Sequence, residues 1–290
     1  MDLVVQTLIS GTLNGFLYVA FALGLSLVMG ILRIINLAHG AILVLAALVL
    51  WQLVNGAGMD PLLMILPVVA LFYAAGYGTH WALVQRMHRE SETTVLLVFF
   101  GLMVILEGIS VLVWTTDTKN LRLGYLGEVL RWGGVNIPVS RLVAVAISLT
   151  VVVALHLFLT RTLWGKAIRG MSEQPDVAGL VGIRTERLAG HVFAGGIALA
   201  ALGGVALAIA LPFTPQEQVR WLAWSFLVVV IGGLGSVTAT FVAGLAVGVI
   251  EAVVASVLPF QYTFFVLYAL LAVVLLLRSN GLSGARTRAI

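Results

Sequence analysis

Residues 7–29 read TLISGTLNGFLYVAFALGLSLVM and contain no charged side chain. An α-helix rises about 1.5 Å per residue, so roughly 20 apolar residues cross the hydrocarbon core of a bilayer. This stretch therefore predicts a transmembrane helix. We do not expect a cleavable signal peptide, because no Lys or Arg precedes the stretch and its apolar part is too long for one.

The composition extends this prediction to the whole chain. Of its 290 residues, 61% are hydrophobic and 10% are charged, and the mean hydropathy is +1.12. Ordinary soluble domains are about 45–50% apolar and about 25% charged. We expect one integral-membrane domain over residues 1–290. The absence of cysteine excludes disulfides, thiolate metal sites and a cysteine nucleophile.

Further apolar runs predict an all-α, polytopic transmembrane helical bundle of about 8–9 spans, with broken or short helices and a cytoplasmic coupling segment. The short run Trp221–Ile231 would be the ninth span. The clear runs are Thr7–Met29, Leu37–Leu53, Leu62–Leu83, Thr94–Trp114, Ser140–Leu159, Leu188–Leu211, Val237–Leu258 and Tyr262–Leu277.

The distribution of Lys and Arg predicts the orientation, because cytoplasmic loops carry the excess of these residues. The larger group would be cytoplasmic: Arg33, Arg86, Arg89, Arg161, Lys166, Arg169, Arg184, Arg187, Arg278, Arg286 and Arg288. The smaller group would be external: Lys119, Arg122, Arg131, Arg141 and Arg220. The N-terminus is then outside and the C-terminus cytoplasmic, which requires an odd number of crossings. If Trp221–Ile231 only dips into the membrane and returns, the number of crossings is even, and the two termini cannot lie on opposite sides as the charges predict. This alternative stays open.

Two glycine-containing breaks interrupt the apolar pattern: residues 30–40 read GILRIINLAHG and residues 232–236 read GGLGS. Irregular backbone at membrane depth survives only against protein or a water-filled cavity, and paired broken helices point to a transport pathway. The alternative is two ordinary helix turns capped by glycine. The predicted substrate-pathway residues are Asn36, His39, Gly232, Gly233, Gly235 and Glu251.

Carboxylates within a span are costly and usually face a cavity or a partner, which draws attention to Glu107 and Glu251. We expect Glu251, the more central of the two, to contact the pathway. The alternative is a protonated or hydrogen-bonded carboxyl that ties two helices together. For His39, a hydrogen bond to backbone freed at the break is favoured over a ligand or proton-relay role.

The longest polar stretch, residues 161–187, reads RTLWGKAIRGMSEQPDVAGLVGIRTER and falls on the predicted cytoplasmic side. Pro175 suits the first position of a short helix that Gly182 would end. An exposed apolar face on such a helix predicts insertion into a groove of a partner protein. The alternative is a helix that lies on the membrane or on the bundle itself. The predicted coupling residues are Gly165, Arg169, Glu173, Asp176, Val177, Leu180, Gly182 and Arg184.

On the opposite side, residues 115–139 form the predicted external loop. We expect an interfacial helix with Leu123, Leu126 and Leu130 on one face. Its positive rim would dock an acidic partner protein. The alternative is routine placement of these side chains at the membrane interface. The predicted docking residues are Arg122, Arg131 and Arg141.

The chain carries none of the motifs that would indicate an enzyme. It has no GxxxxGK[ST] phosphate loop, HExxH or GxSxG pattern, and no paired metal-ligand spacing. Its basic residues are scattered over loops, so nucleic-acid binding is unsupported. We expect no catalytic residue, metal or cofactor, and the chain does not bind ATP through a phosphate loop.

Three segments together carry a family resemblance: INLAHG at residues 35–40, GKAIRGMSEQPDVAGLVGI at 165–183, and IGGLGS with GLAVGVIEA at 231–252. They resemble the LivH-type permease of bacterial branched-chain amino acid ABC importers over nearly the whole chain. The resemblance implies a multi-pass protein of the bacterial cytoplasmic membrane. It also implies four partners: a LivM-type second permease, two ATPase subunits and a periplasmic solute-binding protein. Many members carry an acidic residue where this chain has Ala41, which weakens any assignment of the substrate.

The sequence thus predicts an ABC importer permease that moves branched-chain or related amino acids inward by alternating access. Urea, short amides or another small solute are the alternatives within the same family. An ion-coupled transporter or channel that uses Glu251 and Glu107, and a purely structural membrane subunit, are alternatives outside it.

Overall fold

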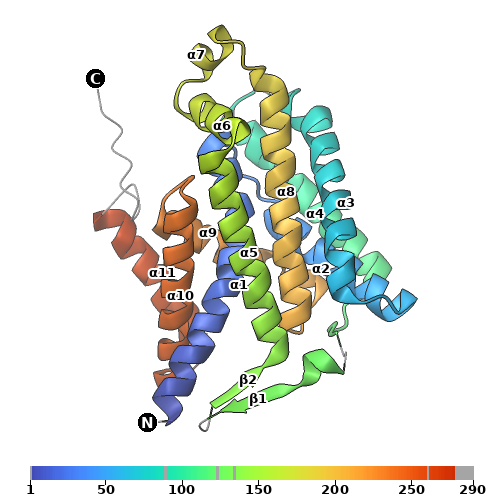
Figure 1. Ribbon diagram of the computed structural model, residues 1–290, viewed down its shortest axis with the longest axis vertical. Helices are drawn as coiled ribbons and strands as arrows, with labels where there is room; N and C mark the ends of the chain where they lie inside the picture. The colour runs from blue at the N-terminus through green and yellow to red at the C-terminus, as the bar shows by residue number, and fades with distance from the viewer. Residues whose placement is uncertain (1, 88–89, 122–123, 133–134, 260, 278–290) are drawn as a thin grey trace.

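The computed structural model describes residues 2–87, 90–121, 124–132, 135–259 and 261–277. They form the elongated helical bundle of Figure 1. Within these residues, seven helices are long and apolar enough to span a membrane: α1 (Asp2–Leu32), α2 (His39–Ala57), α3 (Pro61–Thr79) with its π-helical continuation η1 (His80–Val84), α4 (Glu92–Trp114), α5 (Val139–Arg161), α8 (Thr185–Ala210) and α10 (Val237–Val257). Four are shorter: α6 (Leu163–Glu173), α7 (Pro175–Leu180), α9 (Gln218–Gly232) and α11 (Gln261–Leu277). The predicted all-α membrane fold is confirmed.

The helix starts follow from local sequence. Asp60 caps α3, where its Oδ1 accepts a hydrogen bond of 2.8 Å from the Leu62 amide. Ser91 caps α4 and Ser236 caps α10 in the same manner. Such side chains satisfy amides that have no partner within the helix. Each apolar run predicted from the sequence falls on one of these helices.

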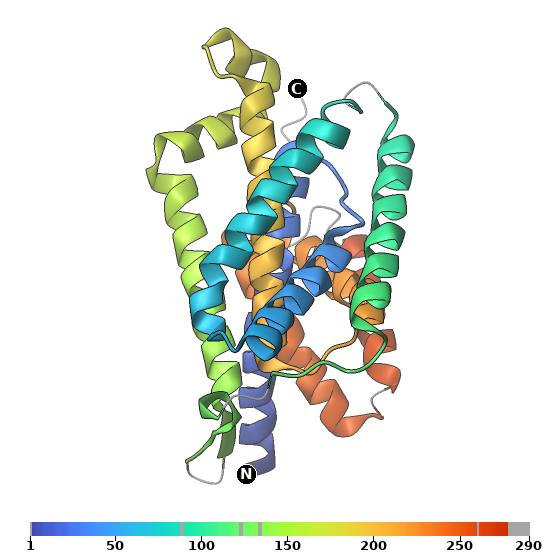
Figure 2. The same cartoon turned by 90° about the vertical axis from the view of Figure 1, so that its right-hand side faces the viewer.

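The core of the bundle consists of α1, α2, α8 and α9. Close to four fifths of the most apolar stretch of α1 and of α8 is buried, whereas α3, α4 and α5 bury less than a fifth of theirs. Figure 2 shows α4 and α5 on opposite flanks of the bundle. These flanking helices present apolar side chains outward, as lipid or a neighbouring subunit requires.

Close glycine contacts define how the helices run. They pair Gly24 with Gly196, Ala20 with Gly203, Val19 with Gly244 and Gly11 with Gly248. Both α8 and α10 therefore run antiparallel to α1. Because α8 and α10 run in the same direction, the chain between Ala210 and Val237 must cross the bundle in the opposite direction. The segment that holds Trp221–Ile231 belongs to this return crossing, so it does not leave on the side from which it entered.

The bundle has two distinct ends. At one end, called the hairpin end, Gln6 near the N-terminus exchanges two hydrogen bonds with the backbone of Asn136. At the other, called the α7 end, lie α6 and α7 (Figure 1). The predicted external loop and coupling segment therefore lie at opposite ends of the bundle.

The interfacial helix predicted for residues 115–139 is wrong. A 3₁₀ turn, η2 (Tyr125–Gly127), leads into an antiparallel hairpin of β1 (Val129–Trp132) and β2 (Val135–Pro138). Leu126 is buried beneath η2, Leu130 is exposed on β1, and Leu123 lies outside the described residues. β-Branched and aromatic residues on either side of a Gly-Gly pair in the sequence favour a hairpin over a helix.

Candidate functional site

The two breaks predicted from the sequence contact each other. Gly30 in the last turn of α1 packs so closely on Gly235 that a Cβ at Gly30 would overlap its backbone. Gly233 and Gly235 have φ angles of 95° and 80°, which favour glycine. Beside them the hydroxyl groups of Ser26 and Thr240 lie 2.9 Å apart. Segments about 200 residues apart in the sequence therefore form one junction at the α7 end of α1.

A second junction links Gly40, at the end of the first break, to the start of α9. A Cβ at Gly40 would overlap the carbonyl oxygen of Gln218 and lie 2.8 Å from the Leu222 Cβ. At its far end α9 runs into Gly232, which packs on Ala239 and Thr240. The short helix α9 is thus held between the two breaks, with one end on α2 and the other close to α1 and α10.

Asn36 and His39 lie inside the first break and are each 1% exposed. The Oδ1 of Asn36 accepts a hydrogen bond of 3.0 Å from the Ala38 amide, which is backbone freed by the break. The Nε2 of His39 lies 2.8 Å from the carbonyl oxygen of Phe21, in the middle of α1. Asn36 therefore stabilises the turn, and His39 ties the start of α2 to α1.

Glu251 has a partner in the bundle. The Tyr18 hydroxyl donates a hydrogen bond of 2.5 Å to its Oε2, and the Tyr18 ring stacks on Trp224 at 4.6 Å between centroids. The contact joins α1, α9 and α10. This geometry is that of a carboxyl which ties helices together. Glu107 lies half-buried on the flanking helix α4.

The short helix predicted at Pro175 is confirmed as α7, Pro175–Leu180. Gly182 follows it with a φ of 87°, and the Ile183 amide donates back to the carbonyl of Ala178 at 3.1 Å. Ala178 is buried, whereas Val177, Leu180 and Val181 are 49%, 86% and 72% exposed. These three side chains form an outward apolar surface, called here the α7 face.

The other predicted coupling residues fall into two groups. Arg169, Glu173 and Arg184 are exposed near α7, and Asp176 contributes its backbone to the first turn of the helix. Gly165 instead lies buried at the α5–α6 corner, where a Cβ would overlap the carbonyl oxygens of Phe158 and Leu159. It therefore shapes the corner and does not belong to the exposed surface.

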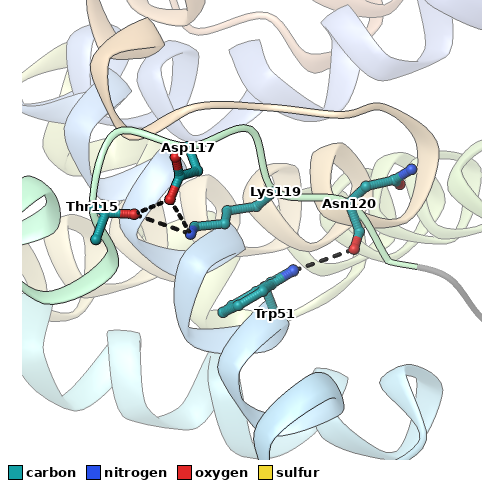
Figure 3. A network of polar contacts seen from close by, with 5 residues as sticks. All are labelled: Trp51, Thr115, Asp117, Lys119 and Asn120. Atoms are coloured by element: carbon teal, nitrogen blue, oxygen red, sulfur yellow. Dashed lines mark hydrogen bonds and ion pairs between the residues drawn. The ribbon is translucent and has the colours of Figure 1, made fainter.

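At the hairpin end, Arg131 is exposed on β1 and Arg141 is half-buried in the first turn of α5; Arg122 lies outside the described residues. Lys119 is held in a polar network, with its Nζ 3.4 Å from Thr115 Oγ1, 4.0 Å from Asp117 and 4.9 Å from the centre of the Trp51 ring (Figure 3).

Nearby, the Tyr125 hydroxyl donates to Asp60 at 2.9 Å. Partial burial and this hydrogen bond raise the pKa of Tyr125 to about 12. Tyr125 therefore stays protonated at neutral pH and holds the loop against the start of α3.

A cavity of about 800 Å³ at the α7 end was not predicted from the sequence. One wall is the α1–α2 segment from Leu32 to Ile35, and η1 supplies another through His80 and Val84. Charged residues at its rim are Arg33, Arg86, Glu90, Glu92 and Glu186. The only sequence signal for it is the short charged stretch at residues 85–93, between two apolar runs. Among the described residues, no group of three or more His, Asp or Glu side chains could hold a metal ion.

Comparison with known proteins identifies the family. The family described as "Branched-chain amino acid transport system / permease component" matches residues 7–275. The chain belongs to this permease family.

Individual members of the permease family are distant but cover nearly the whole chain. The high-affinity branched-chain amino acid transport system permease protein BraD of Pseudomonas aeruginosa is 28% identical over 293 residues, which cover 96% of this chain and 95% of BraD. The LivH permease proteins of Salmonella typhimurium and Escherichia coli K12 are each 27% identical over 297 residues, with the same coverage. No solved structure matches the chain. The resemblance to LivH-type permeases is confirmed, and the chain is a multi-pass membrane protein of this permease family.

Proposed function

We propose that this chain is the permease subunit of an ABC importer that moves branched-chain or related amino acids inward by alternating access. Separate ATPase subunits supply the energy. The α7 face carries this proposal, because it offers three exposed apolar side chains on a helix that the bundle already holds in place. Membership of the permease family supports the class of solute.

The α7 face suits docking of a partner groove. Residues three and four apart share one side of a helix, so Val177, Leu180 and Val181 can enter a groove together. Ala178 is buried in a cluster with Ile168 and Leu188, so α7 cannot turn its apolar side inward without losing that packing. The exposed Arg169, Glu173 and Arg184 provide polar contacts at the rim of such an interface.

The same cluster provides a route for motion from α7 into the bundle. It includes Leu27 of α1, and Ile31 packs against it. One turn away, Gly30 meets Gly235 at the junction of the two breaks. A displacement of α7 by an ATPase would therefore act on the junction that holds α9. We infer that α9 and the two breaks change arrangement between the outward-open and inward-open states.

The remaining partners are assigned to other surfaces. A binding protein would dock at the hairpin end, which becomes the periplasmic face in a bacterial inner membrane, with the N-terminus outside. A second permease of LivM type would cover part of the apolar flank formed by α3, α4 and α5, where few side chains are buried within this chain.

The test uses Leu180→Asp in the complex reconstituted with its two ATPases, second permease and binding protein. We expect loss of at least ten-fold in the ATP hydrolysis stimulated by binding protein loaded with L-leucine, since a buried carboxylate would disfavour the groove contact. Lys166→Asp, an exposed change on α6, is the matched control and should retain stimulation.

Normal co-purification and normal stimulated hydrolysis with Leu180→Asp would exclude α7 as the coupling element. Stimulation of the unaltered complex by urea-loaded or amide-loaded binding protein, and not by leucine-loaded protein, would assign the chain to the other substrate class.

A further inference from the structure

The N-terminus of α2 lies deep in the bundle and has no side-chain cap. Its first residue, His39, bonds to the carbonyl of Phe21, which precedes the end of α1 at Leu32 by eleven residues. At 1.5 Å per residue, this carbonyl lies about 16 Å along α1 from its end, and the His39 side chain reaches it from the start of α2. The preceding residue, Ala38, provides no side-chain hydrogen bond to the helix. The positive end of the α2 dipole is therefore placed at membrane depth.

Hydrogen-bond donors remain open at this position. Within the described part of the chain, the amides of Gly40 and Ala41 have no hydrogen-bond partner. The Nδ2 of Asn36 is buried and has no partner there either. Because Asn36 Oδ1 is bonded to the Ala38 amide, the same planar carboxamide keeps Nδ2 beside the first turn of α2. Unpaired buried donors are costly, so a site of this kind favours an acceptor.

The cavity at the α7 end adjoins this position along the chain. Its wall follows the chain from Leu32 to Ile35, and Asn36 is the next residue. The rim carries both signs of charge: the guanidinium groups of Arg33 and Arg86, and three glutamates. Within the described residues, none of these groups forms an ion pair. A rim with both signs suits a zwitterion better than a simple anion.

We propose that the first turn of α2, together with Asn36 Nδ2, binds the carboxylate of the transported amino acid and that the cavity is its access from the α7 end. Helix N-termini at membrane depth are suited to this task, because backbone amides and the helix dipole both favour negative charge. The proposal rests on the proposed function for its ligand class. Beyond that function, the proposal gives the position at which the carboxylate binds and names Asn36 as the residue that recognises it.

The absence of cysteine from the chain permits a direct binding test. Ile35→Cys places the single thiol of this chain on the cavity wall, and maleimide labelling of this chain is followed in the complex in nanodiscs without binding protein. We expect L-leucine to slow labelling, and L-leucinol, which has a hydroxyl in place of the carboxylate, to leave it unchanged. Lys166→Cys, exposed on α6, is the control and should label at one rate in all conditions.

Asn36→Asp in the same background tests the donor. It retains an acceptor for the Ala38 amide but replaces the NH₂ group by a second oxygen. We expect the leucine concentration for half-maximal protection to rise at least ten-fold. Three results would each overturn the site. They are equal protection by leucinol, unchanged protection with Asn36→Asp, and no protection of Ile35→Cys by leucine.

Failure of the proposed function would appear differently. The parent complex would then show no ATP hydrolysis stimulated by loaded binding protein, whatever the cysteine labelling shows. Stimulated hydrolysis without leucine protection would retain the importer and remove the carboxylate site.

Discussion

Within the bundle, the hydrogen bond between Tyr18 and Glu251 shows how a single polar pair is accommodated among apolar helices. The carboxyl is 7% exposed and the tyrosine 5% exposed. Each group would be costly at this depth without the other. The pair also fixes the relative position of α1 and α10, so its main contribution is expected to be to helix packing.

Replacement of Glu251 should separate its charge from its hydrogen bond. Glu251→Gln keeps an acceptor for Tyr18 and should insert and melt like the unaltered chain. Glu251→Ala leaves the Tyr18 hydroxyl unpaired and should lower stability by about 1–3 kcal/mol. Thermal unfolding in detergent measures both, with Tyr18→Phe in a double-mutant cycle as the control. Transport lost with Glu251→Gln at unchanged stability would instead assign the charge to the substrate pathway.

Among the helices, α1 and α10 approach through glycine. Gly11 and Gly15 on α1 face Gly244 and Gly248 on α10, and a Cβ at Gly248 would overlap the backbone of Gly15. In lipid, no hydrophobic force draws helices together, so their association depends on close packing. Small residues allow the helix backbones to approach closely enough for it. This packing places Thr240 beside Ser26 and Glu251 within reach of Tyr18.

Substitution of one glycine in this contact should separate the helices. Gly248→Ala is expected to lower stability by about 1–3 kcal/mol, since backbone must move to admit the methyl group. Gly108→Ala in α4 is the matched control, because no atom lies within 4 Å of a Cβ there; it should be neutral or stabilising by up to about 1 kcal/mol. Equal melting temperatures for the two variants would contradict this account of the α1–α10 contact.

In the molecule as a whole, the two ends have different chemistry. The α7 end presents an apolar helix face and a charged cavity, while the hairpin end presents a small β-hairpin and the network around Lys119. The backbone of Lys119 also pairs with Phe213 just before α9, at 2.8 Å and 3.1 Å. The hairpin end is therefore linked to the chain segment that leads into the two junctions.

Charge reversal at the hairpin end tests its proposed docking role. Arg131→Glu should slow association with the binding protein, most strongly at low salt, because exposed charges mainly steer encounter. Association rates from surface-immobilised complexes at two salt concentrations measure the effect. Arg187→Glu, exposed at the α7 end, should leave the rate unchanged. An unchanged rate for Arg131→Glu at low salt would exclude this surface.

The sequence by itself determined the fold class, because spans of apolar residues in lipid have few options other than helices. It also located α7, since Pro175 and Gly182 act locally on the backbone on either side of the helix. The same local reasoning failed for residues 115–139, where strand pairing between Val129–Trp132 and Val135–Pro138 outweighed an apparent helical pattern.

Only the tertiary structure decided which distant groups meet. The sequence marked Gly30 and Gly235 as separate breaks, but their contact depends on α1 and α10 packing antiparallel through glycine. It identified Glu251 but not its partner Tyr18, because nothing local in the sequence links residues 233 positions apart. The cavity has the same origin, since its walls come from the α1–α2 segment, η1, α4 and α8, which meet only after the bundle has packed.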